Sequence, residues 1–183
     1  MYDVLSGMRI LELSAFIAAP LAGLTLSQLG ADVIRVDPEG GGMDYKRWPL
    51  SDDNTSLYWA GLNKGKRSVA LDLKHESGRD TFREILASSC EDGGILLTNL
   101  TGPTWLSYDE LCKVRPDLIM VSLTGHNDGK AAVDYTVNCA VGIPMATGYA
   151  TPEKPVNNML PAWDAIAGMT LALAILAAER HRR

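Results

Sequence analysis

Short apolar runs alternate along the chain with longer segments whose apolar positions recur at helical spacing. Five runs of six or seven residues, such as MRILEL and ADVIRVD, are apolar enough to be strands buried on both faces of a sheet. These strands are expected at residues 8–13, 31–37, 68–73, 94–99 and 118–123.

The segments between the strands carry helix signals. Gly30 is placed to end the first helix, and Ser107 with Glu110 forms a capping-box pattern at the start of another. Helices are expected at residues 20–29, 77–89, 107–114 and 164–180, with a broken one at 136–147 around Gly142 and Pro144. This alternation predicts an α/β, Rossmann-like fold, a parallel sheet with helices on both faces. Ligands of such sheets bind beyond the carboxyl ends of the strands.

Composition narrows the class of protein. The 183 residues are 46% apolar, which suits one domain with a real core, and the net charge of −5 argues against a nucleic-acid partner. Cys90, Cys112 and Cys139 form no CxxC pair, and no signal peptide is visible, so a reduced, cytoplasmic setting is expected. The longest uncharged apolar run, 165–178, is shorter than the ~20 residues that span a bilayer, so a buried core helix rather than a membrane contact is expected.

Two loops could bind an anionic ligand. The glycine run 40–42 follows the second strand rather than the first, so the dinucleotide fingerprint is absent, and a plain turn is as good an interpretation as a ligand loop. The basic segment NKGKR supplies Lys64, Lys66 and Arg67, which together with Lys74 could hold phosphates. From the residues alone, a solvated basic loop is favoured over a phosphate site.

Asp164 stands where the last, apolar helix is expected to begin. From the residues alone, a helix N-cap is the favoured role. The alternative is a nucleophile: a carboxylate can attack a thioester carbonyl and expel the thiolate, and the small residues after Asp164 leave room for a thioester. Asp134 could be a second acid/base or positioning group, with a helix-start cap favoured.

The histidines and Cys139 show no pattern of a functional site. His126 lies in a turn-forming segment, and His75 and His181 lack metal-ligand spacing, so no metal site and no permanently bound cofactor are expected. Cys139 has no base near it in sequence and is expected to be a buried structural thiol.

Five segments in register resemble the family III CoA-transferases. They are RILELSAFIAAPLAGLTLSQLGADVIRVD, NKGKRSVALDLKHESGR, LLTNL, RPDLIMVSLTG and WDAIAGMTLALAILAAERHR, and together they cover nearly the whole chain. The resemblance implies that Asp164 is the catalytic nucleophile and that an acyl-CoA thioester is the substrate. It also implies CoA contacts at Ile17 and Ala18 after the first strand, at Leu71, Asp72, Leu73 and Lys74, and at Asn99 and Leu100 after the fourth.

The sequence also departs from the family pattern. Pro38 stands where relatives often have a CoA-contacting Arg, and Trp105 and Leu106 stand near where a second is missing, so these contacts could move to Lys46 and Arg47. The racemases of the family have His just before the Asp that matches Asp134, and here that residue is Val133, which counts against racemase chemistry.

The segments GGGMDYKRWP, LYWAGLNKGKRS, WLSYDEL and VDYTVN look most like family members that move CoA between the two carboxyls of one dicarboxylic acyl-CoA, 2-methylfumaryl-CoA. Members are about twice this length and form interlocked homodimers. The resemblance therefore implies that residues 1–183 are a CoA-binding Rossmann-like domain, the amino-terminal portion of a longer enzyme, with weak or no turnover alone. The alternatives are an intermolecular CoA-transferase or racemase of the family, a nicotinamide-dependent dehydrogenase with Asp37 as the ribose-binding acid, and an inactive CoA-binding fragment.

Overall fold

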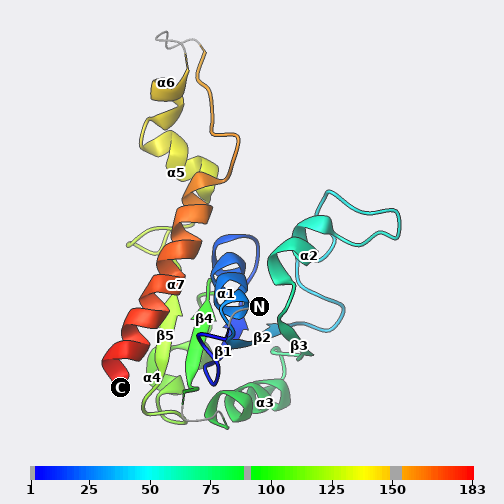
Figure 1. Cartoon of the computed structure of the whole chain (residues 1–183), viewed down its shortest axis with the longest axis vertical. Helices are drawn as coiled ribbons and strands as arrows, with labels where there is room; N and C mark the ends of the chain where they lie inside the picture. Colours follow the sequence, from blue (N-terminus) through cyan, green and yellow to red (C-terminus); the bar gives the residue numbers. More distant parts are fainter. Residues whose placement is uncertain (1–2, 89–91, 149–153) are drawn as a thin grey trace.

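A five-stranded parallel sheet forms the centre of the protein (Figure 1). The computed structural model describes residues 3–88, 92–148 and 154–183. The strand order is β3-β2-β1-β4-β5 and every neighbouring pair is parallel. The strands are β1 (Arg9–Leu13), β2 (Asp32–Asp37), β3 (Arg67–Ala70), β4 (Ile95–Thr98) and β5 (Ile119–Ser122). The α/β, Rossmann-like prediction is confirmed.

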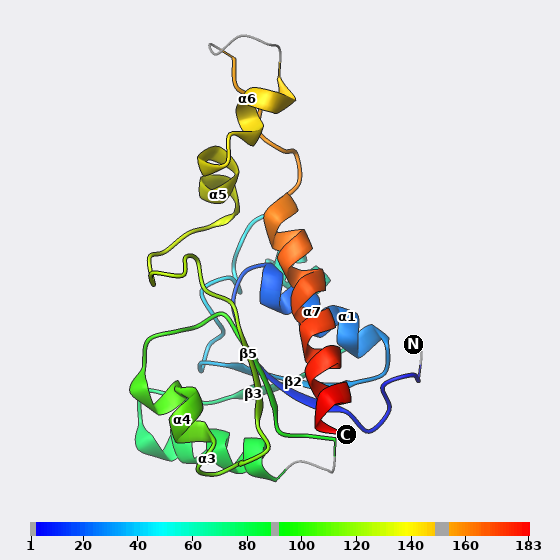
Figure 2. The same cartoon turned by 90° about the vertical axis from the view of Figure 1, so that its left-hand side faces the viewer.

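Helices cover both faces of the sheet (Figure 2). One face packs against α1 (Ala18–Gln28) and the long α7 (Ala162–Arg182), and the other lies against α3 (Glu76–Ala87), the 3-10 turn η1 (Thr104–Leu106) and α4 (Tyr108–Leu111). The predicted helix 77–89 ends at Ala87, and its expected last residue, like Cys90, lies outside the described residues.

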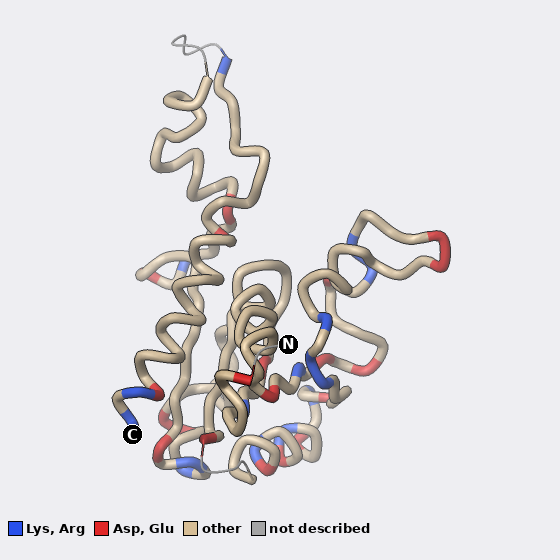
Figure 3. Tube along the Cα trace, viewed as in Figure 1, with Lys and Arg blue, Asp and Glu red and all other residues tan. Residues whose placement is uncertain are grey.

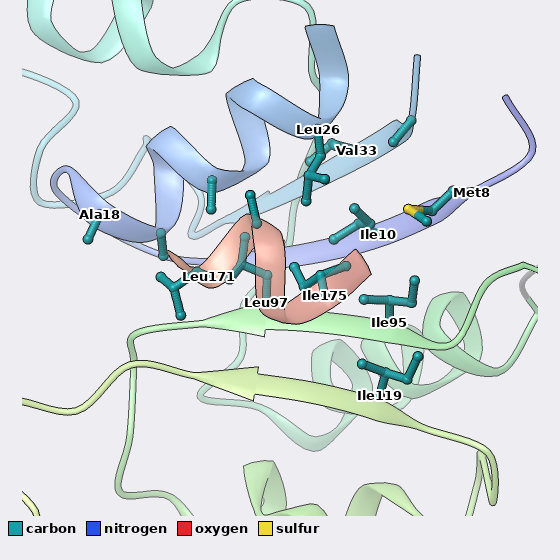
Figure 4. Close-up of a cluster of buried hydrophobic side chains, with 14 residues drawn as sticks. Met8, Ile10, Ala18, Leu26, Val33, Ile95, Leu97, Ile119, Leu171 and Ile175 are labelled. Atoms are coloured by element: carbon teal, nitrogen blue, oxygen red, sulfur yellow. The ribbon is translucent and has the colours of Figure 1, made fainter. Parts of the chain in front are cut away.

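The core between the sheet, α1 and α7 is built from aliphatic side chains (Figure 4). Ile10, Ile95 and Leu97 come from the two central strands and Ile175 from α7, and all four are fully buried. Burying each such side chain contributes about 1.5–3 kcal/mol. This packing fixes α7 against the sheet along much of its length.

The two ends of α7 are held by different parts of the chain. At its carboxyl end, Arg182 Nη1 donates to the backbone oxygens of Gly93 (2.7 Å) and Asp117 (3.2 Å), next to the amino ends of β4 and β5. At its amino end, α7 meets α5 (Asp134–Ala140). α5 and α6 (Ile143–Thr147) extend away from the sheet (Figures 1 and 2).

By length and composition α7 could also cross a membrane. Its most apolar stretch has a mean hydropathy of 1.4, and 28% of that stretch is buried. Figure 3 shows that its charges gather at the two ends. In this fold Leu171, Ala172 and Ile175 belong to the core, whereas Ile166, Met169 and Leu173 are exposed, so α7 is only in part the buried core helix that was expected.

Some local features differ from the sequence predictions. α2 (Leu57–Asn63) was not expected; Ser56 caps it by accepting a hydrogen bond from Trp59 N. Cys139 is exposed, so the expectation of a buried thiol is wrong: α5 turns that side chain outward where nothing covers it among the described residues.

Candidate active site

The carboxyl ends of β1 and β4 mark the topological switch point of this sheet, where such folds bind ligands. Asn99, just after β4, holds the segment after β1: its Oδ1 accepts from Ala15 N (2.9 Å) and its Nδ2 donates to Ala15 O (2.7 Å). The next residue, Phe16, has a left-handed backbone (φ 66°), and its N–H donates to Asp44 Oδ2 (2.8 Å). The loop is thus fixed in a costly conformation of the kind found at functional sites.

Asp164 lies near this loop, in the first turn of α7. The helix N-cap is Pro161, which places Asp164 at the third helical position. The expectation that Asp164 caps the helix is therefore wrong, since its side chain is not used to satisfy the helix end. That role belongs to Asp134, whose Oδ2 accepts hydrogen bonds from Trp163 N (2.7 Å) and Asp164 N (3.2 Å).

A second residue of α5 completes this clamp. Asn138 is fully buried, and its Oδ1 accepts hydrogen bonds from Trp163 Nε1 (3.0 Å) and Asn158 Nδ2 (3.2 Å). Asp134 and Asn138 lie one turn apart on the same face of α5. Together they hold the turn that carries Asp164. For Asp134 this is the positioning role considered from the sequence, and the helix start that it caps is that of α7 rather than that of α5.

Helix packing brings Asp164 close to the start of α1. Gly168 is buried, and a Cβ there would come within 2.9 Å of Ala18 O and 3.0 Å of Leu21 Cβ, so only glycine lets the helices approach this closely. Asp164 precedes Gly168 by four residues, which puts it on the same helix face. The carboxyl group therefore lies on the side of α7 that faces the start of α1 and the loop 14–17.

The electrostatic surroundings of Asp164 suit a reactive carboxylate. Burial raises the pKa of Asp164, the Asp134 carboxylate raises it further, and the Arg47 guanidinium opposes both. Burial also raises the pKa of Tyr58 to about 12, and the charges of Arg47 and Asp164 act on it in opposite directions. Arg47, Tyr58 and Asp164 are therefore electrostatic neighbours, although they are far apart in sequence.

Beneath the loop lies a network of buried charges. Arg35 pairs with Glu12 (3.3 Å), Asp37 (2.9 Å) and Asp44 (3.6 Å), and Lys66 pairs with Glu12 (2.8 Å). The side chains of Arg35 and Lys66 are each only 1% exposed. Phosphate binding by Lys66 is therefore excluded, since its Nζ is used by Glu12, Asn63 and Pro20 O. The sequence could not show that the Glu12 carboxylate, from β1, lies beside the basic segment that contains Lys66.

The same network bears on the dehydrogenase alternative. Asp37 is 7% exposed, and Arg35 donates to both of its carboxylate oxygens, from Nε (2.9 Å) and Nη2 (3.0 Å). An acid engaged in this way is not available to accept hydrogen bonds from a ribose. The structure therefore disfavours a nicotinamide dinucleotide at this strand end.

The expected CoA contacts lie at three strand ends. Ile17 is half-buried and Ala18 is 2% exposed, so Ala18 offers a ligand very little surface. Leu100 lines an open hollow of about 370 Å³ beyond β4 and β5, together with Pro103 and Ser122. The segment after β3 follows the sheet edge and comprises Leu71, Asp72, Leu73 and Lys74; Lys74 is exposed, and the two leucines pack partly on the core. Their contacts with CoA stay predictions.

Comparisons with known proteins identify the family of this chain. The profile of CoA-transferase family III matches residues 5–183. The chain is 55% identical to 2-methylfumaryl-CoA isomerase of Chloroflexus aurantiacus, over 100% of this chain and 45% of that protein. It is 32% identical to the succinyl-CoA–L-malate CoA-transferase beta subunit of the same organism, over 97% of this chain and 45% of that protein.

Solved structures show the same fold. A CAIB/BAIF family protein from Brucella suis matches with a TM-score of 0.86 and 28% identity, over 97% of this chain and 49% of that one. The Mycobacterium tuberculosis protein Rv3272 matches with a TM-score of 0.81 and 31% identity, over 97% and 49%. The chain thus spans about half the length of these relatives. With nearly every residue matched in sequence and in fold, the chain belongs to CoA-transferase family III.

Proposed function

We propose that Asp164 is the nucleophile of a CoA transfer between the two carboxyls of one dicarboxylic acyl-CoA of the 2-methylfumaryl-CoA type. The observation that carries this proposal is the position of Asp164: half-buried in the first turn of α7, with its helix end capped by another residue and its pKa raised by burial. The identity of 55% to a 2-methylfumaryl-CoA isomerase supports the substrate class.

The chemistry requires a covalent intermediate. The Asp164 carboxylate attacks the thioester carbonyl, the C–S bond breaks, and CoA leaves as thiolate, which gives a mixed anhydride. The thiolate then attacks the aspartyl carbonyl of that anhydride, which forms an Asp164–CoA thioester and releases the dicarboxylate. A free carboxylate is a poor electrophile, so the second carboxyl of the dicarboxylate must first attack the Asp164–CoA thioester, which releases CoA thiolate and forms a new mixed anhydride with Asp164. The thiolate then attacks the substrate carbonyl of this anhydride, which forms the isomeric acyl-CoA and regenerates the Asp164 carboxylate.

The fold supports this role for the rest of the chain. The predicted CoA contacts Ile17 and Asn99 lie at the switch point of the sheet, and the backbone of the intervening loop is clamped by Asn99 and Asp44. A fixed backbone offers its N–H groups without the cost of ordering them when the ligand arrives. We infer that residues 1–183 act as the CoA-binding domain, with little turnover alone, and that the active enzyme is a homodimer.

Trapping the acyl-enzyme tests the proposal. The full-length protein is incubated with 2-methylfumaryl-CoA, and the isomer is followed by chromatography while hydroxylamine converts any aspartyl anhydride or thioester to a hydroxamate. We expect the hydroxamate at Asp164 by mass spectrometry, and Asp164→Asn should lose both hydroxamate and turnover by at least about a thousandfold.

The matched control is Asp128→Asn, since Asp128 is an exposed carboxylate in a loop and pairs with its neighbour Lys130. This variant should keep the wild-type rate. Turnover by the Asp164→Asn protein close to that of wild type would overturn the proposal.

Intermolecular transfer is the second candidate, favoured by the 32% identity to a succinyl-CoA–L-malate CoA-transferase subunit. The two reactions separate when isotopically labelled free dicarboxylic acid is added. Intramolecular transfer leaves the label in the free acid, whereas intermolecular transfer moves it into the thioester pool at the rate of turnover.

A further inference from the structure

Arg47 is held in a fixed pose at the edge of the Asp164 site. Its backbone N donates to Asp44 O (3.1 Å), and its backbone O accepts from the side chain of Ser56, the cap of α2. Its guanidinium lies over the Tyr58 ring (4.5 Å to the centroid) and near the Phe16 ring (5.5 Å). Two aromatic rings thus orient the guanidinium plane before any ligand binds.

The guanidinium of Arg47 can bind an anionic ligand. Among residues 3–88, 92–148 and 154–183, no carboxylate lies within salt-bridge distance of it, and the residue is exposed. Arg35, the other arginine beside Asp44, instead donates hydrogen bonds to Glu12, Asp37 and Ser14 inside the protein. A pre-oriented arginine with free donors suits a carboxylate, which it can bind through two parallel hydrogen bonds.

Its neighbourhood identifies which anion it would bind. Arg47 acts electrostatically on both Asp164 and Tyr58. The Tyr58 hydroxyl is buried without a hydrogen-bond partner among the described residues, so the polar group beside the Arg47 guanidinium has an unmet hydrogen bond. Near Asp164 the ligand atoms are those of the acyl group, because the nucleophile must touch the thioester carbonyl.

An intramolecular transfer brings a second carboxylate to the same place. Both carboxyls of the substrate must reach Asp164 in turn, so the one that does not carry CoA stays nearby as an anion. The carboxyl groups of Asp164 and Asp134 already lie there, and a substrate carboxylate placed beside them without a cation would bind weakly. We infer that Arg47 binds the free carboxylate of the acyl group, which makes it the residue that selects dicarboxylic over monocarboxylic acyl-CoA. This inference rests on the proposed function.

The test compares acid and ester substrates in the full-length protein. The probes are 2-methylfumaryl-CoA and its methyl ester, in which the free carboxylate is neutral, and the reading is acyl-enzyme formation at Asp164. Arg47→Gln should lower kcat/KM for the acid by about tenfold to a hundredfold, the range expected for a lost charged hydrogen bond, and leave the ester within about twofold. Arg47→Lys should give a smaller loss, because it keeps the charge but not the planar fork.

Two controls distinguish a carboxylate contact from a general charge effect and from a phosphate contact. Lys46→Gln removes the neighbouring exposed charge and should leave the ratio of acid to ester rates unchanged. Inhibition by free CoA measures any contact with the CoA phosphates: if Arg47→Gln weakens free CoA as much as it weakens the acid, Arg47 binds phosphate and the inference fails. Equal losses for acid and ester would also overturn it, because Arg47 would then act on Asp164 or the loop rather than on the substrate.

A binding measurement keeps the inference separate from the proposed function. The acid and the ester are titrated into Asp164→Asn protein with and without Arg47→Gln. A preference for the acid that depends on Arg47 supports the carboxylate site even if wild type forms no acyl-enzyme, an outcome that would overturn only the nucleophile role. Binding of the two probes that is equal in both proteins overturns the inference.

Discussion

The amino end of α7 depends on a carboxylate from another helix, and removing it should loosen the turn that carries Asp164. Asp134 Oδ2 accepts from two backbone N–H groups of this turn, at 2.7 and 3.2 Å. Loss of a capping side chain costs about 0.5–2 kcal/mol, and hydrogen bonds to a charged acceptor reach about 1.5–3 kcal/mol. We therefore expect Asp134→Ala to lower the free energy of unfolding by about 2 kcal/mol.

Asp134→Asn separates the cap from the charge. Its amide oxygen can still accept, so the stability cost should fall to about 0.5–1 kcal/mol, mainly the lost attraction between a negative charge and the helix end. Because the Asp134 carboxylate raises the pKa of Asp164, the same substitution should lower that pKa and move the acid limb of the pH–rate profile to lower pH.

Urea denaturation followed by tryptophan fluorescence measures the stability change, since Trp163 lies in the affected turn. Hydrogen exchange at the Asp164 amide detects fraying that does not unfold the whole domain. Asp128→Ala, in an exposed loop, is the control and should change stability by less than about 0.5 kcal/mol. If Asp134→Ala leaves both the unfolding midpoint and the Asp164 amide protection at wild-type values, the cap contributes nothing and the reasoning is wrong.

Three further changes test other parts of the structure. Lys66→Met leaves the buried Glu12 carboxylate with one cation fewer and should lower the free energy of unfolding by about 3–5 kcal/mol, as measured by urea denaturation. A loss below about 1 kcal/mol would show that the Lys66–Glu12 pair does not stabilise the fold. Gly168→Ala forces a Cβ to within 2.9 Å of Ala18 O and should cost about 1–3 kcal/mol with a fall in acyl-enzyme formation, whereas Gly61→Ala, where a Cβ meets nothing within 4 Å, should not destabilise. Asp164→Asn should be more stable than wild type at neutral pH. Because the pKa of Asp164 is raised in the fold, the wild-type protein loses stability as the pH rises from 3.8, the ordinary pKa of Asp, through the folded pKa. The difference in stability should vanish below pH 3.8, and a difference that grows on acidification would contradict a raised pKa of Asp164.

Periodicity alone predicted the sheet and most of its covering helices. Gly30 follows the end of α1 with a positive φ of 108°, and the Ser107 cap of α4 is present, with its side chain accepting from Glu110 N. These signals are local, so a single sequence carries them. α2 was not predicted because its seven residues, two of them aromatic, show no helical periodicity of apolar positions, although Ser56 before it is a favourable N-cap.

The site was only partly predictable, because its partners come from distant segments. Lys66 was expected in a solvated basic loop, with phosphate binding as the alternative, and both interpretations are wrong for it because the fold buries it against Glu12. Asp164 looked like a cap because the sequence could not show that Asp134 accepts from the same helix end. Arg47 stood out only as an alternative CoA contact, since its orientation depends on two aromatic rings from other parts of the chain.

The helix that carries Asp164 also fixes the direction in which this side chain points from the helix axis. α7 has 21 residues, about 30 Å at ~1.5 Å per residue, and Arg182 anchors its far end to backbone oxygens beside β4 and β5. One residue inserted between these points would rotate the carboxylate by about 100° about the helix axis and carry it out of reach of the loop 14–17. The spacing between anchor and nucleophile is therefore a fixed length, and we expect single-residue insertions within α7 to abolish transfer where substitutions on its outer face are tolerated.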